Sequence, residues 1–145
     1  MVSSGARRRE PNGEGELPRW IKKRIGFSQD GLILEALVTA LDEGLAAKIG
    51  GGHSHVGSVV IAQPRPSLRG DGSVSCTSSV WNQTEHKGEA VARPVAERLC
   101  RTLNTVVVVS AGDHLPNADA SQIDTVDRLT DALASQIVQD RRKSP

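Results

Sequence analysis

Aromatic residues are nearly absent from this chain of 145 residues: it has two tryptophans, one phenylalanine and no tyrosine. Proteins that hold single-stranded nucleic acid stack the bases on aromatic side chains. The composition therefore argues against a nucleic-acid-binding role.

Cysteine and long apolar runs are also scarce. The two cysteines, Cys76 and Cys100, are too few for a disulfide scaffold or a cysteine-built zinc site. The longest purely aliphatic run covers only positions 106–109, whereas a membrane-spanning helix needs roughly 18 residues. The first ten residues contain no hydrophobic stretch, so we expect no secretory signal and a cytoplasmic location.

The charges are unevenly placed, although the formal net charge is only +1. Residues 1–24 carry a net charge of +4 and residues 139–145 one of +2, while residues 25–138 carry −5. The length fits one domain with its own core. We expect a flexible basic arm at residues 1–27, one domain at 28–139 and a basic tail at 140–145. Residues 17–27 would form a short helix or an arm docked on the body or on a second subunit.

The first half of the domain indicates strands. Residues 32–49 fit either a helix or a hairpin, with Leu34, Ala36, Val38 and Ala40 on one face and a turn at residues 42–44. Residues 56–63 predict a strand that ends at Pro64, because proline cannot continue a ladder. Residues 73–81 predict a second strand, whose small hydroxyl side chains and Trp81 share one face. That face suits a ligand floor, a subunit contact or plain exposure to solvent.

The second half indicates two helices around a buried strand. A stripe of apolar residues at every fourth position predicts a helix over residues 89–103, which Pro94 would kink or begin. Residues 105–111 predict the strand. A capping box from Ser121 to Asp124 predicts the start of the last helix, whose apolar stripe extends to Ile137. The expected fold is α+β, a largely antiparallel β-sheet with the two helices packed on one face.

Two clusters combine glycine, histidine or arginine in ways that suit a ligand. Residues 50–57 join three glycines to His53 and His55, and glycines let backbone N–H groups approach an anion closely. The two histidines alone are too few for a metal site. Arg65, fixed between two prolines and followed by Ser67, suits a phosphate or carboxylate, although an exposed arginine in a rigid turn explains the same pattern.

Two further clusters flank predicted elements. Lys87 precedes the helix over residues 89–103, where free N–H groups attract anions. Residues 113–117 leave the buried strand, and loops in that position commonly carry function. They hold the polar residues Asp113, His114 and Asn117.

Four stretches together resemble a known family. They are Gly51-Gly52 with His55-Val56-Gly57, residues 62–68 (AQPRPSL), His86-Lys87 and residues 111–114 (AGDH). Their order and spacing resemble the small accessory subunit of bacterial hydroxyaryl (gallate-type) decarboxylases over roughly residues 30–138. That family is similar in fold to the proteasome assembly chaperones.

The resemblance implies a non-enzymatic accessory protein. Such a protein would bind prenylated FMN or FMN as cargo, protect it and deliver it to a UbiD-type decarboxylase, and would form a homodimer. A flavin phosphate needs a cation and donors, and the isoalloxazine needs a flat apolar wall with polar edges. The candidate cofactor-binding residues are Gly51, Gly52, His55, Arg65, Ser67, Thr77, Ser79, Trp81, His86, Lys87, Asp113, His114 and Asn117. We expect no catalytic and no metal-binding residue.

Two other functions stay open on the sequence. A protein-assembly chaperone without a small ligand would share the fold and expose an apolar patch. A metal-dependent hydrolase would need three convergent ligands from His53, His55, His86, His114 and Asp113.

Overall fold

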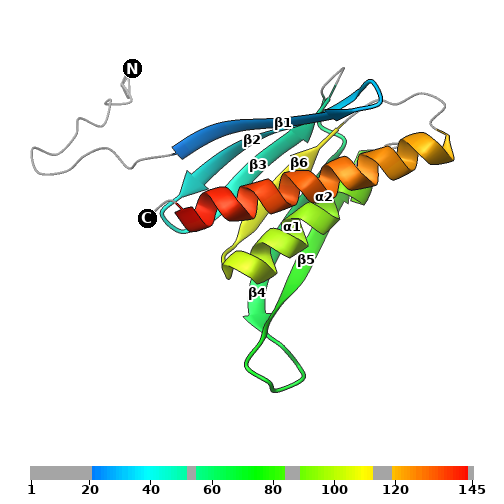
Figure 1. The fold of residues 1–145 in the computed structure, drawn as a ribbon. Helices are drawn as coiled ribbons and strands as arrows, with labels where there is room; N and C mark the ends of the chain where they lie inside the picture. The colour runs from blue at the N-terminus through cyan, green and yellow to red at the C-terminus, as the bar shows by residue number, and fades with distance from the viewer. Residues whose placement is uncertain (1–20, 52–54, 84–88, 113–118, 144–145) are drawn as a thin grey trace, which may run out of the picture.

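A computed structural model describes residues 21–51, 55–83, 89–112 and 119–143 as one sheet covered by two helices (Figure 1). The sheet has six strands in the order β1-β2-β3-β6-β4-β5, and every neighbouring pair is antiparallel except β3 and β6. The predicted α+β class is thus confirmed. The elements are β1 (Ile21–Gln29), β2 (Leu32–Leu41), β3 (Gly44–Gly50), β4 (Ser58–Pro66), β5 (Val74–Asn82), α1 (Glu89–Leu103), β6 (Val107–Ala111) and α2 (Ala120–Lys143).

Residues 32–49 form the hairpin β2–β3 and not a helix. Every second side chain of β2, from Leu34 to Ala40, is buried, as the alternation predicted. Leu41 pairs with Gly44 across a two-residue turn. Gly44 has a φ of 130°, which side chains rarely adopt, so glycine is required at this position.

The segment before residue 28 joins the sheet. β1 pairs with β2 along its whole length, so the boundary expected at residue 28 falls inside an edge strand. Ile25 is buried and Phe27 packs against the core. Residues 21–27 therefore form a strand and no helix, with Ile25 and Phe27 facing the helix layer.

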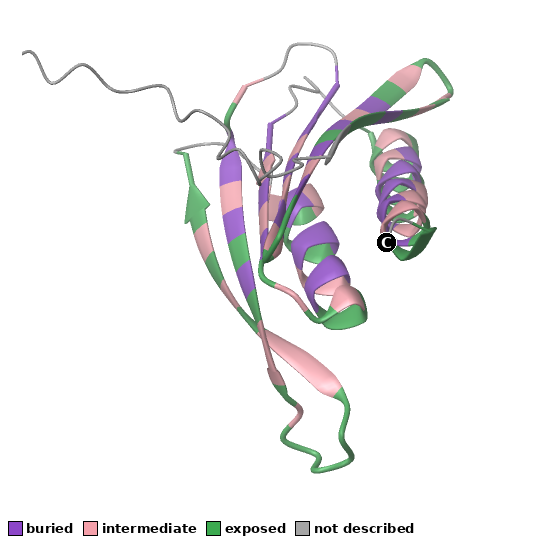
Figure 2. Cartoon of the chain, turned by 90° about the vertical axis from the view of Figure 1, so that its left-hand side faces the viewer, coloured by how far each residue is buried: buried purple, intermediate pink, exposed green. Residues whose placement is uncertain are grey.

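β4 continues through Pro66, and the prediction that it ends at Pro64 is wrong. β6 pairs with β4 only up to Ala62, so beyond this residue β4 has one neighbour, β5. A proline at an unpaired edge removes no ladder hydrogen bond, because its missing N–H would face solvent. The hairpin of β4 and β5 consequently extends past the rest of the sheet (Figures 1 and 2).

Both helices cover the same face of the sheet (Figure 1). α1 packs on β4, β5 and β6, while α2 packs on β1, β2 and α1. The predicted stripe of α1 is confirmed, with Val95 and Leu99 fully buried. Pro94 is exposed within the helix and does not begin it. The core lies between the helices and this face, as the buried bands of Figure 2 show.

The capping box of α2 lies two residues before its predicted position. The Gln122 amide donates to Asp119 Oδ1 at 2.8 Å, and the Gln122 side chain accepts the Asp119 amide at 3.1 Å. Asp119 and Gln122 have the same spacing as Ser121 and Asp124, so the pattern alone could not choose between them. Leu129, Leu133 and Ile137 are buried as predicted.

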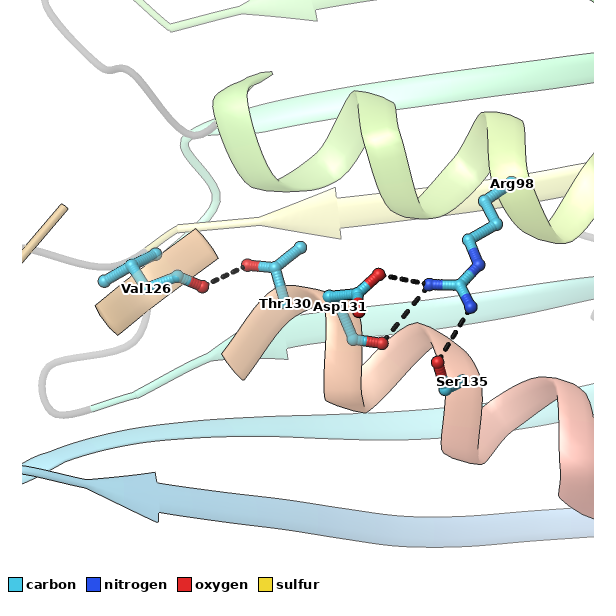
Figure 3. A network of polar contacts seen from close by, with 5 residues as sticks. All are labelled: Arg98, Val126, Thr130, Asp131 and Ser135. Carbon is cyan, nitrogen blue, oxygen red and sulfur yellow. Dashed lines mark hydrogen bonds and ion pairs between the residues drawn. The ribbon is translucent and has the colours of Figure 1, made fainter. Parts of the chain in front are cut away.

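Arg98 ties the two helices together (Figure 3). Its guanidinium donates to Asp131 Oδ1 at 2.6 Å, to the Asp131 carbonyl at 3.3 Å and to Ser135 Oγ at 2.7 Å. Elsewhere in α2, Thr130 donates back to the carbonyl of Val126 at 2.7 Å. The pairing of α1 with α2 thus adds polar contacts to its apolar packing.

No helix covers the opposite face of the sheet in the described structure, and we call this the open face. It carries the alternate residues that point away from the core. They are Arg24, Ile33, Glu35, Leu37, Thr39, Leu41, Ala46, Lys48, Val59, Ile61, Gln63, Arg65, Ser75, Thr77, Ser79, Trp81, Val108 and Ser110.

Candidate functional site

One row of open-face residues crosses the middle of the sheet. Lys48 of β3 lies beside Ser110 of β6, which lies beside Val59 of β4, which pairs with Trp81 of β5. Three strand spacings separate Lys48 from Trp81, about 14 Å at the usual spacing. The next row places Val108, Ile61 and Ser79 alongside. A cation, hydroxyl groups, an apolar floor and an aromatic side chain therefore share one surface.

Trp81 and Ser79, two of the predicted residues, are exposed on this surface as the alternation predicted. The indole is the largest exposed apolar group of the β4–β5 half, with 57% of its surface accessible. It offers a flat wall against which a planar ligand can stack.

Close backbone contacts join the ends of the central strands β3, β6 and β4 near this row. The Gly57 amide donates to the Ala111 carbonyl at 3.0 Å, and the Gly112 amide donates to the Ile49 carbonyl at 3.2 Å. A Cβ added to Gly112 would lie 2.0 Å from the His55 carbonyl oxygen. Gly112 thus lets the segment at His55 lie directly on the end of β6.

Lys48 was not among the residues predicted from the sequence. Its Nζ donates to the His55 carbonyl oxygen at 2.5 Å. The side chain is partly buried, and this burial lowers its pKa. The available signal was one lysine in the otherwise apolar run of residues 45–49, but the strand pairing was needed to show what surrounds it.

Arg65 and Thr77, also predicted, meet at the far end of the open face. The Arg65 Nε donates to Thr77 Oγ1 at 3.0 Å, and the guanidinium also contacts the Pro66 carbonyl at 3.2 Å. Ser67 lies in the adjoining hairpin loop, where its Oγ accepts the Arg69 amide at 3.3 Å.

The structure does not bring Arg65 and Ser67 to Gly51. Arg65 lies seven positions along extended β4 from Ser58, which pairs with Ala111 beside Gly112, and this is a distance of about 23 Å. One phosphate group cannot contact both ends. No local pattern in the sequence indicates this separation, because it depends on β4 running straight through its prolines.

Six predicted residues lie outside the described residues: Gly52, His86, Lys87, Asp113, His114 and Asn117. His53 lies outside them as well. Within the described part of the chain, no three His, Cys, Asp or Glu side chains gather into a possible metal site.

The sequence matches the prenylated flavin chaperone LpdD-like domain over residues 28–142. The chain belongs to the LpdD-like family. The family is named for chaperones of prenylated flavin, which supports a chaperone role for this member. No functionally curated protein is detectably similar to it in sequence.

The fold of this LpdD-like domain has a solved counterpart. It is similar to a chain of a chaperone complex for yeast 20S proteasome assembly, with a TM-score of 0.54 and 16% identity. The alignment covers 90% of the LpdD-like chain and 100% of the yeast chain. The predicted relation of the fold to the proteasome assembly chaperones is confirmed. Among the residues described, no helix combines the length and hydropathy of a membrane span.

The LpdD-like domain has a cavity of about 180 Å³ on the helix side of its sheet, away from the open face. Between α2 and the strands β1 and β2, apolar residues and a polar rim line this cavity. Lys23 Nζ lies 2.8 Å from Asp140 Oδ2, and this contact lowers the pKa of Asp140. No residue predicted as a binding site lines the cavity.

Both cysteines belong to the core side of the LpdD-like fold. Cys100 is fully buried in α1 and Cys76 packs against the core from β5, as predicted. Burial and the neighbouring Cys76 raise the pKa of the Cys100 thiol to about 11. At neutral pH this thiol is protonated and is a poor nucleophile.

Proposed function

We propose that this chain binds prenylated FMN as cargo and delivers it to a UbiD-type decarboxylase, without catalysing a reaction itself. The family match over residues 28–142 is the observation that carries the proposal. A carrier needs to bind, shield and release its cargo. Moderate affinity suffices for these steps, because the acceptor enzyme must win the competition.

The donor set of the open face fits a flavin. The isoalloxazine is a flat ring system with polar edges, for which Trp81 offers a stacking wall and Val59 and Ile61 offer an apolar floor. The Ser79 and Ser110 hydroxyls can pair with the polar edges. Lys48 in the middle of this surface and Arg65 at its hairpin end are the two candidate cations for an anionic group. Once bound in the acceptor enzyme, the prenylated flavin would supply the chemistry of decarboxylation, a redox-neutral exchange of CO₂ for a proton.

The same face supports a homodimer. Large apolar side chains are exposed on it, and a sheet face of this kind is normally covered by another layer. A second copy of the chain would cover the residues Ile33, Leu37, Leu41, Ile61 and Trp81. Leu37→Asp should convert a dimer to a monomer in light scattering, while Leu68→Asp at the exposed hairpin tip should not. A wild-type monomer would contradict the dimer.

Anaerobic titration with reduced prenylated FMN tests the cargo proposal directly. Absorbance and native mass spectrometry should show saturable binding, followed by transfer to an apo-decarboxylase. Trp81→Leu should weaken binding without changing the circular dichroism spectrum. Leu68→Ser is the matched control, because that side chain is 92% exposed and lies away from the central row. Absence of binding by wild type would refute the proposal.

A protein-assembly chaperone without a small ligand is the second candidate. The exposed apolar side chains and the similarity to the yeast chain favour it. A stable complex with a partner protein that forms equally well without flavin would support this candidate over the first.

A further inference from the structure

Lys48 places a positive charge in the middle of the open face. Its strand neighbours on that face are Leu37 of β2 and Ser110 of β6. Glu35 of β2 is one position along the strand on the same face, but it pairs with Arg24, with a shortest N–O distance of 2.6 Å. Within the described residues, no carboxylate forms an ion pair with Lys48.

The ammonium has further hydrogen-bonding capacity. It carries three donors, and the described contact to the His55 carbonyl uses one. The side chain is also partly buried, and the burial of a cation costs free energy unless a counter-charge or acceptors compensate. Among the described residues, the His55 carbonyl accepts one hydrogen bond from this ammonium, but no carboxylate supplies a counter-charge.

The residues in the same row as Lys48 indicate which chemical groups a ligand at this surface would carry. The Ser110 hydroxyl lies next in register, the apolar side chain of Val59 follows, and Trp81 closes the row about 14 Å away. A ligand that fills this row joins an anionic group at the β3 end to a planar ring near β5. Arg65 cannot take the same part, since it lies at the hairpin end of β4.

We propose that Lys48 anchors the cargo by pairing with an anionic group of the flavin, beside Ser110. This inference rests on the proposed function and deepens it. A reduced flavin offers two anions, the phosphate and the deprotonated ring, and both present the acceptor chemistry that an ammonium pairs with. Binding would give Lys48 the counter-charge that the described residues do not provide.

Binding of four probes to wild type and Lys48→Met distinguishes the two anions. The probes are oxidised and reduced FMN, and oxidised and reduced riboflavin, all used without oxygen. If Lys48 pairs with the phosphate, the variant binds both forms of FMN about 10- to 100-fold more weakly and binds riboflavin unchanged. If Lys48 pairs with the ring, only the reduced probes lose affinity. Lys143→Met, an exposed lysine at the end of α2, is the matched control and should bind all four probes like wild type.

Two results would refute the proposal that Lys48 pairs with an anionic group of the flavin. Unchanged affinity of Lys48→Met for every probe would mean that no anion pairs with Lys48. An equal loss for all four probes, including neutral oxidised riboflavin, would mean that Lys48 only supports the fold. Light scattering and urea unfolding of the variant show whether its assembly or stability has changed.

A second measurement tests anion binding at Lys48 independently of whether the protein binds a flavin. Acetylation of Lys48 by acetic anhydride, followed by peptide mass spectrometry, should slow in the presence of FMN or inorganic pyrophosphate. If wild type binds no flavin but pyrophosphate still protects Lys48, the flavin cargo is refuted and the anion anchor is supported. Protection by neither anion would refute the anchor.

Discussion

Substitution of Gly112 by alanine should displace the segment from His55 to Gly57, which lies against the end of β6. The added Cβ would lie 2.0 Å from the His55 carbonyl oxygen and 2.9 Å from the Gly57 nitrogen. Both are backbone atoms, so no side-chain rotation can relieve the overlap. The segment from His55 to Gly57 must therefore move away from the end of β6.

The structure sets the size of the effect. Movement of this segment breaks the hydrogen bond from the Gly57 amide to the Ala111 carbonyl, which contributes about 1 kcal/mol. Overpacking of a buried contact costs about 1–3 kcal/mol more. We expect Gly112→Ala to lower the free energy of unfolding by about 2–4 kcal/mol, measured by urea denaturation with circular dichroism.

Gly26→Ala is the matched control. A Cβ there would meet its nearest atom at 3.8 Å, which is ordinary contact, and Gly26 lies in the exposed edge strand β1. Its free energy of unfolding should stay within about 0.5 kcal/mol of wild type. A Gly112→Ala protein as stable as Gly26→Ala would refute the reasoning, because the contact between His55 and β6 would then be readily displaced.

Three further predictions concern the helix side of the sheet. Arg98→Met should lower the free energy of unfolding by about 1 kcal/mol in urea, because the bridge it removes is partly exposed; no change would mean that apolar packing alone joins the helices. The contact with Lys23 lowers the pKa of Asp140, so its stabilisation is full above about pH 4 and disappears as the pH falls through the folded-state pKa. Asp140→Asn should therefore be less stable than wild type at pH 7 and equally stable near pH 2, and a constant difference would contradict the ion pair. Iodoacetamide at pH 8 should modify Cys76 before Cys100 in the folded protein, and equal rates by mass spectrometry would contradict the burial of Cys100.

Local patterns predicted the elements where one face of a strand or helix meets the core. The hairpin alternative for residues 32–49 placed Leu34, Ala36, Val38 and Ala40 on one face, and these are the buried positions of β2, because successive strand residues point to opposite faces. The four-residue spacing of Val95 and Leu99 marks the buried stripe of α1 for the same reason. Each of these signals lies within a single strand or helix. It can therefore be read from the local sequence, without knowing which element packs against it.

Features that depend on distant segments escaped prediction. Pro64 and Pro66 are tolerated because β6 begins beside Ala62 and does not extend along the prolines, and nothing near the prolines in sequence indicates this. Lys48 acquires its surroundings only when β3 pairs with β6 in parallel, which joins segments about 60 residues apart in the sequence. Arg65 and Gly51 were grouped by chemistry, although the length of β4 keeps them apart.

The lysine in the centre of the open face favours a ligand over a purely protein interface. If a second copy or another protein covered this face alone, Lys48 would become fully buried, and its charge would need a partner from the other chain. An apolar residue at that position would suit such an interface better, since Leu37 beside it and Val59 in the same row are already apolar. A cargo that brings its own negative charge removes this conflict. Bound as proposed, such a cargo would neutralise Lys48 without a charged partner from another chain.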